Sequence, residues 1–368
     1  MFRRWILPGL LFQSVMVGGG YATGRELVEF FLSYGALGGL LGLLLVTVMF
    51  SVAAAIFLEF ARLTRSLTYS HFFGALLGRG WRLFEAGYLL LGMLVLAVVG
   101  AAAGEIGNGI LGIGTVPGTL LLCALVLVVV YHGTGFLERV LASWSLLLYA
   151  VYLLFITLFL LRYGDGVPGT ILKGDRDPYW FLGSVQYVGY NLVVLPAIVF
   201  CVAHLEDRRD SLVAGLFCGP LAMIPAVLFY LAMCADPQAI RAAPVPADYM
   251  IRKLDIEWLS LLFYVTIFGT FIETGSAFIH SLNQRIAESR ARGGIDFAHR
   301  HRALVAAACL VISIGLAESV GLINLVARGY VALTWYFLLV FVLPLLVVGL
   351  PRVLRSAEQK PAGTPSDD

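Results

Sequence analysis

The sequence predicts an all-α polytopic membrane protein with ten transmembrane helices, and three observations lead to this prediction. The 368-residue chain is 60% hydrophobic and only 13% charged, a balance typical of helices that face lipid. Ten apolar segments are each bounded by turn or charge signals. Most of them approach the roughly 20 residues that a bilayer-spanning helix needs. The charges lie mainly between these segments, so the net charge of +2 indicates no nucleic-acid partner.

The expected spans follow one another with two long connections. One connection, over residues 164–178, is rich in glycine, proline and charge, and Ala247–Leu254 in the other could form a short surface helix. The tail Ser356–Asp368 is polar and contains proline, so we expect it to be disordered. The spans run approximately over residues 7–32, 37–60, 83–110, 118–132, 140–162, 179–203, 211–234, 257–284, 303–325 and 329–350.

The basic residues predict the orientation. Lys and Arg concentrate on cytoplasmic connections, and most of the 25 basic residues here fall on segments that share a side with the N-terminus. Both termini are therefore expected in the cytoplasm. The five cysteines show no metal-ligand spacing, and we interpret them as packing residues. Glu59 and Arg62 at a cytoplasmic helix end are expected to form a surface pair.

The first span contains three consecutive glycines, Gly18, Gly19 and Gly20, which disfavour a continuous helix. Lipid cannot pair the backbone groups freed by such a break, so the break must face protein or a wet cavity. Arg25 and Glu26 follow directly, and intramembrane charges favour a functional interpretation. The alternative is that the glycines only allow a neighbouring helix to pack closely.

The sixth span predicts a second interruption. Tyr187–Asn191 is followed by Pro196, whose ring and missing N–H disturb a helix. The alternative is a proline kink with Asn191 bonded to a neighbour. Two interrupted spans in corresponding positions indicate the binding site of a transporter. The predicted substrate-binding residues are Gly18, Gly19, Gly20, Tyr21, Tyr187, Gly189, Tyr190 and Asn191.

The second half of the chain weakly repeats the first. Ser14 matches Ser184, and Glu105 matches Glu273, at an offset of about 170 residues. This offset joins spans one and six, and three and eight, which are an odd number of spans apart. The two halves, residues 1–165 and 166–355, would therefore be five-helix repeats inverted in the membrane.

The eighth span carries a candidate cation site. Thr270, Glu273 and Thr274 share one helix face through their i, i+3, i+4 spacing. Together with free carbonyl groups at the first-span break, their oxygens could bind a hard cation, and Glu273 could instead carry a proton. The alternative for Glu273 is a structural bond, for example to Arg25.

Other embedded charges have less definite roles. Arg25, Glu26 and Glu105 are candidates for a gating or charge pair, although Glu105 and Glu318 lie nearer the outer ends of their spans. Amide groups after the first break could receive an anion, and tyrosine rings near both breaks could hold an ammonium group. This mixture favours a small zwitterion or amine over a sugar or a lipid.

The run Gly18-Gly19-Gly20-Tyr21-Ala22-Thr23-Gly24-Arg25-Glu26 resembles the first span of the YkvI-type membrane proteins. These are bacterial members of the amino acid–polyamine–organocation superfamily with the LeuT fold. The resemblance implies a bacterial inner-membrane protein with a five-plus-five inverted repeat and with spans one and six unwound at their centres. It also implies a cation site completed by span eight.

Carried over by position, the resemblance gives the ligands of that cation. They are backbone oxygens around Gly18 and Tyr21, with Thr270, Glu273 and Thr274. A carboxylate at Glu273 departs from the hydroxyl pair usual in sodium-coupled relatives, so Na⁺ and protons both stay open as coupling ions. The resemblance implies no other cofactor.

The function expected from the sequence is therefore a cation-coupled secondary transporter of a small amine or amino-acid-like solute. A channel or a ligand-binding membrane sensor would suit the same fold, and the oligomeric state stays open. An intramembrane enzyme is disfavoured. No HExxH or GxGD motif is present, and Ser276 with His280, one turn apart on a single helix, does not assemble a catalytic dyad.

Overall fold

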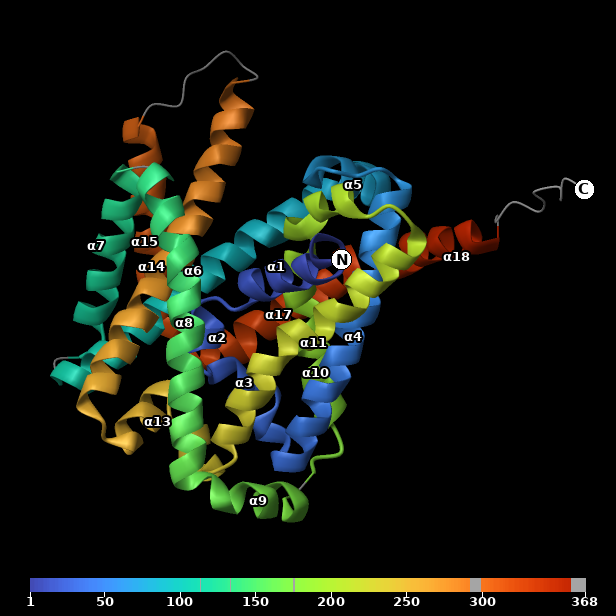
Figure 1. Ribbon diagram of the computed structural model, residues 1–368. Coiled ribbons are helices and arrows are strands. Elements are labelled where there is room, and N and C mark those ends of the chain that lie inside the picture. Colours follow the sequence, from blue (N-terminus) through green and yellow to red (C-terminus); the bar gives the residue numbers. More distant parts are fainter. Residues whose placement is uncertain (113, 133, 175, 292–298, 359–368) are drawn as a thin grey trace, which may run out of the picture.

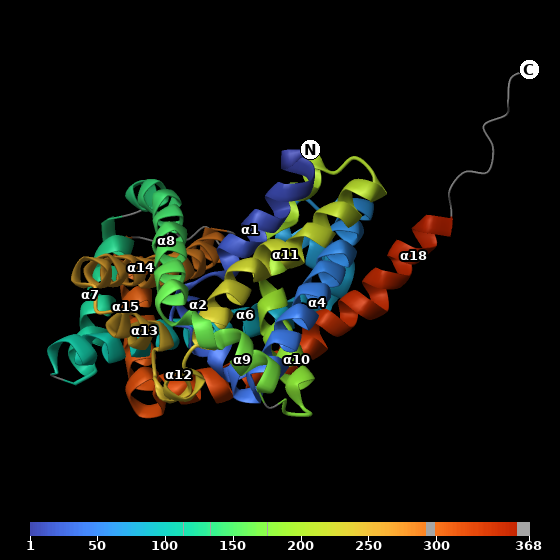
Figure 2. The same cartoon turned by 60° about the horizontal axis from the view of Figure 1, so that its bottom comes forward.

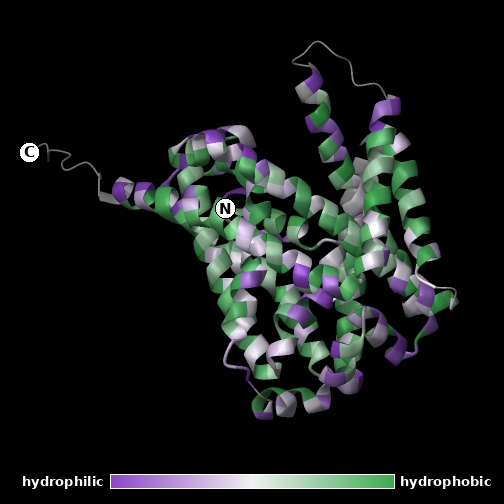
Figure 3. Cartoon of the chain, turned by 180° about the vertical axis from the view of Figure 1, so that it is seen from behind, coloured by the Kyte–Doolittle hydropathy of each residue, from purple (hydrophilic) through white to green (hydrophobic). Residues whose placement is uncertain are grey.

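The computed structural model describes residues 1–112, 114–132, 134–174, 176–291 and 299–358, and within these ranges it is helical without a strand. Eight helical segments of the described chain are long and apolar enough to cross a membrane. Together with a shorter apolar helix and the interrupted first span, they account for the ten expected spans. Hydrophobic residues cover most of the helices, and hydrophilic residues gather at helix ends and connections (Figure 3).

The spans have the following bounds in chain order. The first span is α1 (Leu7–Met16), α2 (Gly19–Ala22) and α3 (Arg25–Phe30). Single helices follow: α4 (Ala36–Leu63), α6 (Trp81–Leu111), α7 (Val116–His132) and α8 (Thr134–Tyr163). The sixth span is α10 (Trp180–Asn191) with the 3₁₀ helix η5 (Leu192–His204). The next three are α11 (Arg208–Met233), α14 (Glu257–Ala291) and α15 (His299–Val320).

The tenth span alternates between α-helix and wider π-helical turns. It comprises α16 (Leu322–Asn324), η6 (Leu325–Tyr330), α17 (Val331–Phe337), η7 (Leu338–Val342), η8 (Leu345–Gly349) and α18 (Leu350–Glu358). Short helices in the connections are α5 (Tyr69–Leu77), α9 (Val167–Lys173), α12 (Pro237–Ala242) and α13 (Pro246–Leu254). The expected surface helix before the eighth span is confirmed as α13, and α9 lies in the connection that is rich in glycine, proline and charge.

The long helices form two groups (Figure 1). In one group α4, α10 and α11 pack together, and α1 packs on α11. In the other, α6 and α14 pack with α7 and α15. The short α2 contacts both α6 and α14. The break in the first span therefore lies where the two groups meet.

The backbones of α4 and α11 approach each other closely. A Cβ atom on Gly215 would overlap the backbone of Ala55, and one on Gly219 would overlap the carbonyl oxygen of Thr47. The Ser51 hydroxyl donates to the Leu216 carbonyl at 3.0 Å. Small residues four apart let two membrane helices approach this closely, so α4 and α11 are held as one unit.

The expected interruption of the first span is confirmed. Helix α1 ends at Met16, Val17 has ψ 73°, and Gly18 is extended with ψ −171°. A second break follows at Gly24, whose φ of +78° is left-handed. The span therefore crosses the bundle as three short helices.

Replacing Gly24 with alanine is expected to lower stability by about 2–4 kcal/mol. The left-handed conformation costs a side-chain-bearing residue about 1–2 kcal/mol. The new Cβ would also lie 2.5 Å from Met233 Cε and 3.0 Å from the Phe229 ring, and such overpacking costs about 1–3 kcal/mol. Thermal unfolding of the purified protein in detergent measures the loss.

Gly112 provides the matched control for this substitution. Its φ is +69° and no atom lies within 4 Å of an added Cβ, so Gly112→Ala reports the backbone contribution alone. Equal losses in the two variants would show that Met233 and Phe229 do not constrain the break at Gly24.

The sixth span differs from its expectation. It remains helical throughout, changing from α-helix to 3₁₀ helix at Leu192 and continuing for 13 residues around Pro196. Runs of 3₁₀ helix longer than three or four residues are uncommon. The Asn191 side chain donates to the Tyr187 carbonyl at 3.0 Å. The α-helix of this span is therefore interrupted as expected, but by a change of pitch and not by an unwound segment.

The boundary between the last two spans was also misplaced. Gly321 has φ +74°, which ends α15 at Val320 and starts the tenth span at Leu322. Helix α18 then carries the chain to Glu358 and projects from the bundle (Figure 2). The rest of the tail expected to be disordered, residues 359–368, lies outside the described residues.

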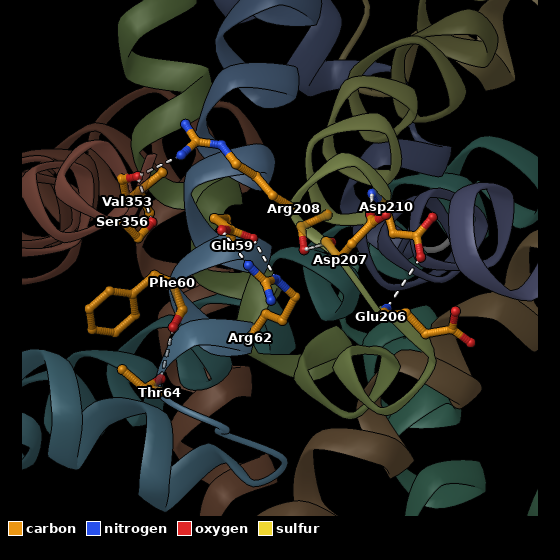
Figure 4. A network of polar contacts seen from close by, with 11 residues as sticks. Glu59, Phe60, Arg62, Thr64, Glu206, Asp207, Arg208, Asp210, Val353 and Ser356 are labelled. Atoms are coloured by element: carbon orange, nitrogen blue, oxygen red, sulfur yellow. Dashed lines mark hydrogen bonds and ion pairs between the residues drawn. The ribbon is translucent and has the colours of Figure 1, made fainter. Parts of the chain in front are cut away.

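A polar network occupies the end of the bundle near the N-terminus (Figure 4). The carboxylate of Glu59 is fully buried and accepts two bonds from Arg62, at 2.8 Å and 2.7 Å. The expected pair is therefore confirmed, but its surface position is wrong for Glu59, because α4 is covered here by other elements. Arg208 donates to the Val353 carbonyl at 3.1 Å and ties α18 to the start of α11.

Candidate functional site

A cavity of about 400 Å³ lies beside the first break. It is bounded by α1, η5 and the middle of α14, with α6 and α8 completing its wall. The threonine–glutamate face predicted from the eighth span lines this cavity together with Gly18. Polar or aromatic residues of the wall are Ser14, Tyr88, Tyr149, Thr270, Glu273, Thr274 and Phe278.

The break lies directly against α14, where Gly18 faces Thr274. A Cβ on Gly18 would lie 3.6 Å from Thr274 Oγ1 and 3.8 Å from its Cγ2. Thr270 is 2% exposed, and its hydroxyl donates to the Thr266 carbonyl at 3.0 Å. A hydroxyl that donates in this way keeps its lone pairs for a cation or a donor.

The carbonyl groups outside the helical ladder lie slightly earlier in the chain than the two predicted as cation ligands. The helical ladder ends where Val17 N–H donates to Gln13, and it resumes where Ala22 N–H donates to Gly18. The carbonyl groups of Ser14, Val15 and Val17 fall between these two points. Those predicted as ligands, of Gly18 and Tyr21, already accept bonds from Ala22 and Gly24.

A second cavity of about 110 Å³ adjoins the first and shares Gly18 and Thr274 with it. Tyr190 Oη donates to Glu26 Oε2 at 2.6 Å, and the Tyr190 ring stacks on that of Tyr330 with centroids 4.6 Å apart. The predicted substrate residues that line this cavity are Gly18, Gly20, Tyr21, Tyr190 and Asn191. Gly19 begins α2 between them.

Two predicted residues of the sixth span lie outside both cavities. Tyr187 is fully buried among aromatic rings, with the Phe31 ring 5.0 Å away. A Cβ on Gly189 would lie 2.6 Å from Thr334 Cγ2, so this glycine allows α10 to pack on α17. Both residues serve the packing that holds α10 in place.

The predicted pairing of Arg25 is wrong. Its guanidinium donates to Glu29 at 3.0 Å and to the carbonyl groups of Arg241 and Ala243, at 3.0 Å and 3.3 Å. It contacts neither Glu26 nor Glu273 in these bonds. Neighbouring residues on a helix point in different directions, whereas residues four apart face each other. Among the described residues no ion pair joins Arg25 to Glu26 or Glu105, and Glu105 lines neither cavity; a gating role for these residues stays a prediction.

The connection that carries α12 and α13, named here the outer connection after its expected side, closes over the first span. The N–H of Ala247 in α13 donates to the Thr23 carbonyl at 3.0 Å, and Tyr152 Oη donates to the Ala22 carbonyl. Within the connection, Lys253 and Tyr249 donate to Asp236. Burial opposes ionisation of Asp236, but these bonds outweigh it and lower the pKa of the carboxyl group. The ion pair therefore persists at neutral pH.

The larger cavity opens in the opposite direction. Ser14 and Ala277 in its wall are exposed, and Val15 is 46% exposed. Ser14 and Val15 lie at the end of α1 next to the break, and Ala277 lies one turn beyond Glu273 towards the connection after α14. The exposed part of the wall is therefore on the α1 side of the break.

Three tyrosines of the site were not predicted. Tyr88, Tyr149 and Tyr330 come from the third, fifth and tenth spans, none of which shows a break in its sequence. The sequence signal that could have identified them is a tyrosine, with its hydrogen-bonding hydroxyl group, within an otherwise apolar segment.

Comparisons with known proteins agree with this architecture. No family model matches the chain. The sequence is 24% identical over 292 residues to the "uncharacterized membrane protein YkvI" of Bacillus subtilis (strain 168), covering 75% of this chain and 79% of that protein.

Two solved structures share the fold. The inward facing conformation of Mhp1 matches with a TM-score of 0.50 at 14% identity, over 91% of this chain and 76% of that one. The Eremococcus coleocola manganese transporter, in complex with an aromatic bis-isothiourea substituted compound, matches with a TM-score of 0.51 at 14% identity. That match covers 96% of this chain and 88% of that one.

Proposed function

We propose that this chain, a YkvI-type membrane protein with the LeuT fold, is a secondary transporter. It couples the movement of a cation to that of a small amine or amino-acid-like solute by alternating access. The proposal keeps residues 1–165 and 166–355 as inverted repeats. It places the protein in a bacterial inner membrane with both termini in the cytoplasm.

The observation that carries this proposal is the one-sided cavity at the first break. Irregular backbone at membrane depth persists only where it is buried in protein or lines a wet space. Here it lies against the polar face of α14, near the middle of that helix. The path is closed towards α13 and open on the α1 side of the break, as alternating access requires of one end state.

The residues around the larger cavity suit a small hard cation or a proton. The α14 face offers two hydroxyl groups and one carboxylate, and the break adds carbonyl oxygens; oxygen is the ligand that hard cations prefer. Among the described residues no three His, Cys, Asp or Glu side chains converge. We therefore use the likeness to the manganese transporter for the fold alone and not for the transported ion. Na⁺ or H⁺ is the proposed coupling ion.

Proteoliposomes test the proposal. Thermal shifts with amino acids and amines, in sodium and in potassium buffer, first select a probe from glycine, alanine, ethanolamine and choline. The labelled probe should then accumulate in a saturable manner only when a sodium or proton gradient is imposed. Empty liposomes and dissipated gradients are the controls.

The same assay separates the alternatives. Flux that follows the solute gradient without saturation would indicate a channel. Binding of the probe without any flux would indicate a membrane sensor. Either result would overturn the transporter assignment.

A further inference from the structure

The smaller cavity holds a carboxylate that no cationic side chain neutralises. Glu26 is 5% exposed and lines the cavity. Among the described residues it takes part in no ion pair; its recorded hydrogen-bond partner is the hydroxyl group of Tyr190. The neighbouring Arg25 directs its bonds to Glu29 and to the outer connection instead.

This arrangement leaves a negative charge facing an enclosed space. An ionised carboxylate within a membrane protein is strongly disfavoured unless it is paired. A hydrogen bond from one tyrosine relieves only part of this penalty. A cation that enters from the cavity would supply the pairing that an ionised Glu26 needs.

The walls of the cavity favour an organic cation. The Tyr190 and Tyr330 rings stack with their planes only 13° apart, beside the carboxylate. The hydroxyl group of Tyr21 is buried without a hydrogen-bond partner in the described structure. Aromatic faces attract ammonium groups, and a lone hydroxyl can accept a hydrogen bond from one. Glu26 is the only carboxylate in the described lining of this cavity, and most of the other polar groups there belong to tyrosine rings.

Gly20 preserves the room for such a group. A Cβ on Gly20 would lie 2.5 Å from Glu26 Oε1 and 3.2 Å from Tyr330 Oη. Any side chain at this position would occupy the space between the carboxylate and the ring.

We propose that Glu26, with Tyr21, Tyr190 and Tyr330 around it, binds the protonated amine of the solute. This inference rests on the proposed transport function and narrows its substrate class to cationic or zwitterionic amines. It also separates two positive charges. The solute ammonium lies at Glu26, and the coupling cation lies at Glu273, with Gly18 and Thr274 shared by both cavities.

Equilibrium binding with charge-matched probes tests the inference. Calorimetry on the purified protein compares ethanolamine with 1-propanol, and choline with 3,3-dimethylbutan-1-ol; each pair differs by an ammonium group in place of its carbon analogue. At least one amine should bind, and its neutral partner should bind roughly tenfold more weakly or worse. Stronger binding of ethanolamine than of choline would indicate direct hydrogen bonds to Glu26, whereas the reverse would indicate that the rings dominate.

Variants locate the binding to this cavity. Glu26→Gln should weaken amine binding by roughly tenfold or more, whereas Glu105→Gln, which removes an embedded carboxylate outside both cavities, should not. Gly20→Ala should weaken it similarly, and Gly100→Ala is the control, since a Cβ there meets only ordinary contacts at 3.5 Å and beyond. If Glu26→Gln does not fold, the Gly20 pair and Tyr190→Phe give the same readout.

The outcomes distinguish the two proposals. Equal binding of the neutral partners, unchanged affinity in Glu26→Gln, or no amine binding at all would each overturn the amine site. Saturable gradient-driven uptake of a non-amine solute would overturn the amine site and leave the transporter assignment intact. Glu26-dependent amine binding without flux would preserve the site and overturn transport.

Discussion

Replacing Glu273 with glutamine is expected to weaken cation-driven accumulation of the solute strongly. Glu273 supplies the carboxylate of the larger cavity, on the same α14 face as Thr270 and Thr274. Glutamine keeps the size of the side chain and removes its charge. Charge-assisted contacts are worth about 1.5–3 kcal/mol each, so the affinity for the coupling cation should fall by about ten- to a hundredfold.

Initial uptake rates in proteoliposomes over a range of sodium concentrations and pH values measure this loss. If sodium is the coupling ion, the sodium concentration for half-maximal uptake should rise in the variant. If a proton is the coupling ion, the pH dependence of accumulation should disappear. Glu105→Gln serves as the control. Unchanged uptake at every pH and sodium level would remove Glu273 from the coupling mechanism.

Replacing Arg25 with alanine is expected to open the outer side of the protein. The Arg25 guanidinium is the joint between α3 and the connection that carries α12 and α13. Arg25 is 4% exposed. Its removal leaves the Glu29 carboxylate and two carbonyl groups without their donor. The loss of charge-assisted bonds of about 1.5–3 kcal/mol each should shift the ratio of open to closed forms by at least roughly tenfold.

A native cysteine can report this opening. Cys234 follows α11 directly before the outer connection and is fully buried. In a background where the other four cysteines are replaced, a membrane-impermeant maleimide should modify Cys234 at least about tenfold faster in Arg25→Ala than in the parent.

Arg252→Ala is the matched control for this experiment. Arg252 also lies on the outer connection and pairs with Asp248, but its side chain is 40% exposed. Exposed pairs contribute little to stability, so its removal should leave the labelling rate nearly unchanged. Equal labelling of Cys234 in the parent and in Arg25→Ala would show that the closure depends on other contacts.

Local sequence signals predicted the part of the site that depends on local structure. Three adjacent glycines disfavour a helix wherever they occur, so the break at Gly18 follows from residue types alone. The spacing of Thr270, Glu273 and Thr274 places them on one face of any helix. The same signals did not predict the conformation of the sixth span, because Pro196 can be accommodated by a change of helical pitch as well as by an extended segment.

Features that depend on tertiary packing were not accessible in this way. Tyr88, Tyr149 and Tyr330 come from three different spans, and only the folded bundle brings them to the two cavities. Arg25 was expected beside Glu26 in space because it is beside it in sequence. The structure directs it to Glu29 one turn away and to two carbonyl groups more than two hundred residues later.

The 3₁₀ conformation of Leu192–His204 has a mechanical consequence. A 3₁₀ helix rises about 2.0 Å per residue and an α-helix about 1.5 Å, so these 13 residues are stretched by roughly 6–7 Å relative to the α form. Rewinding them would draw in the chain by a little more than one α-helical turn. The ring of Pro196 opposes α-helical hydrogen bonding in the turn that precedes it. The segment can therefore shorten by rewinding after Pro196, while its first turn keeps its length.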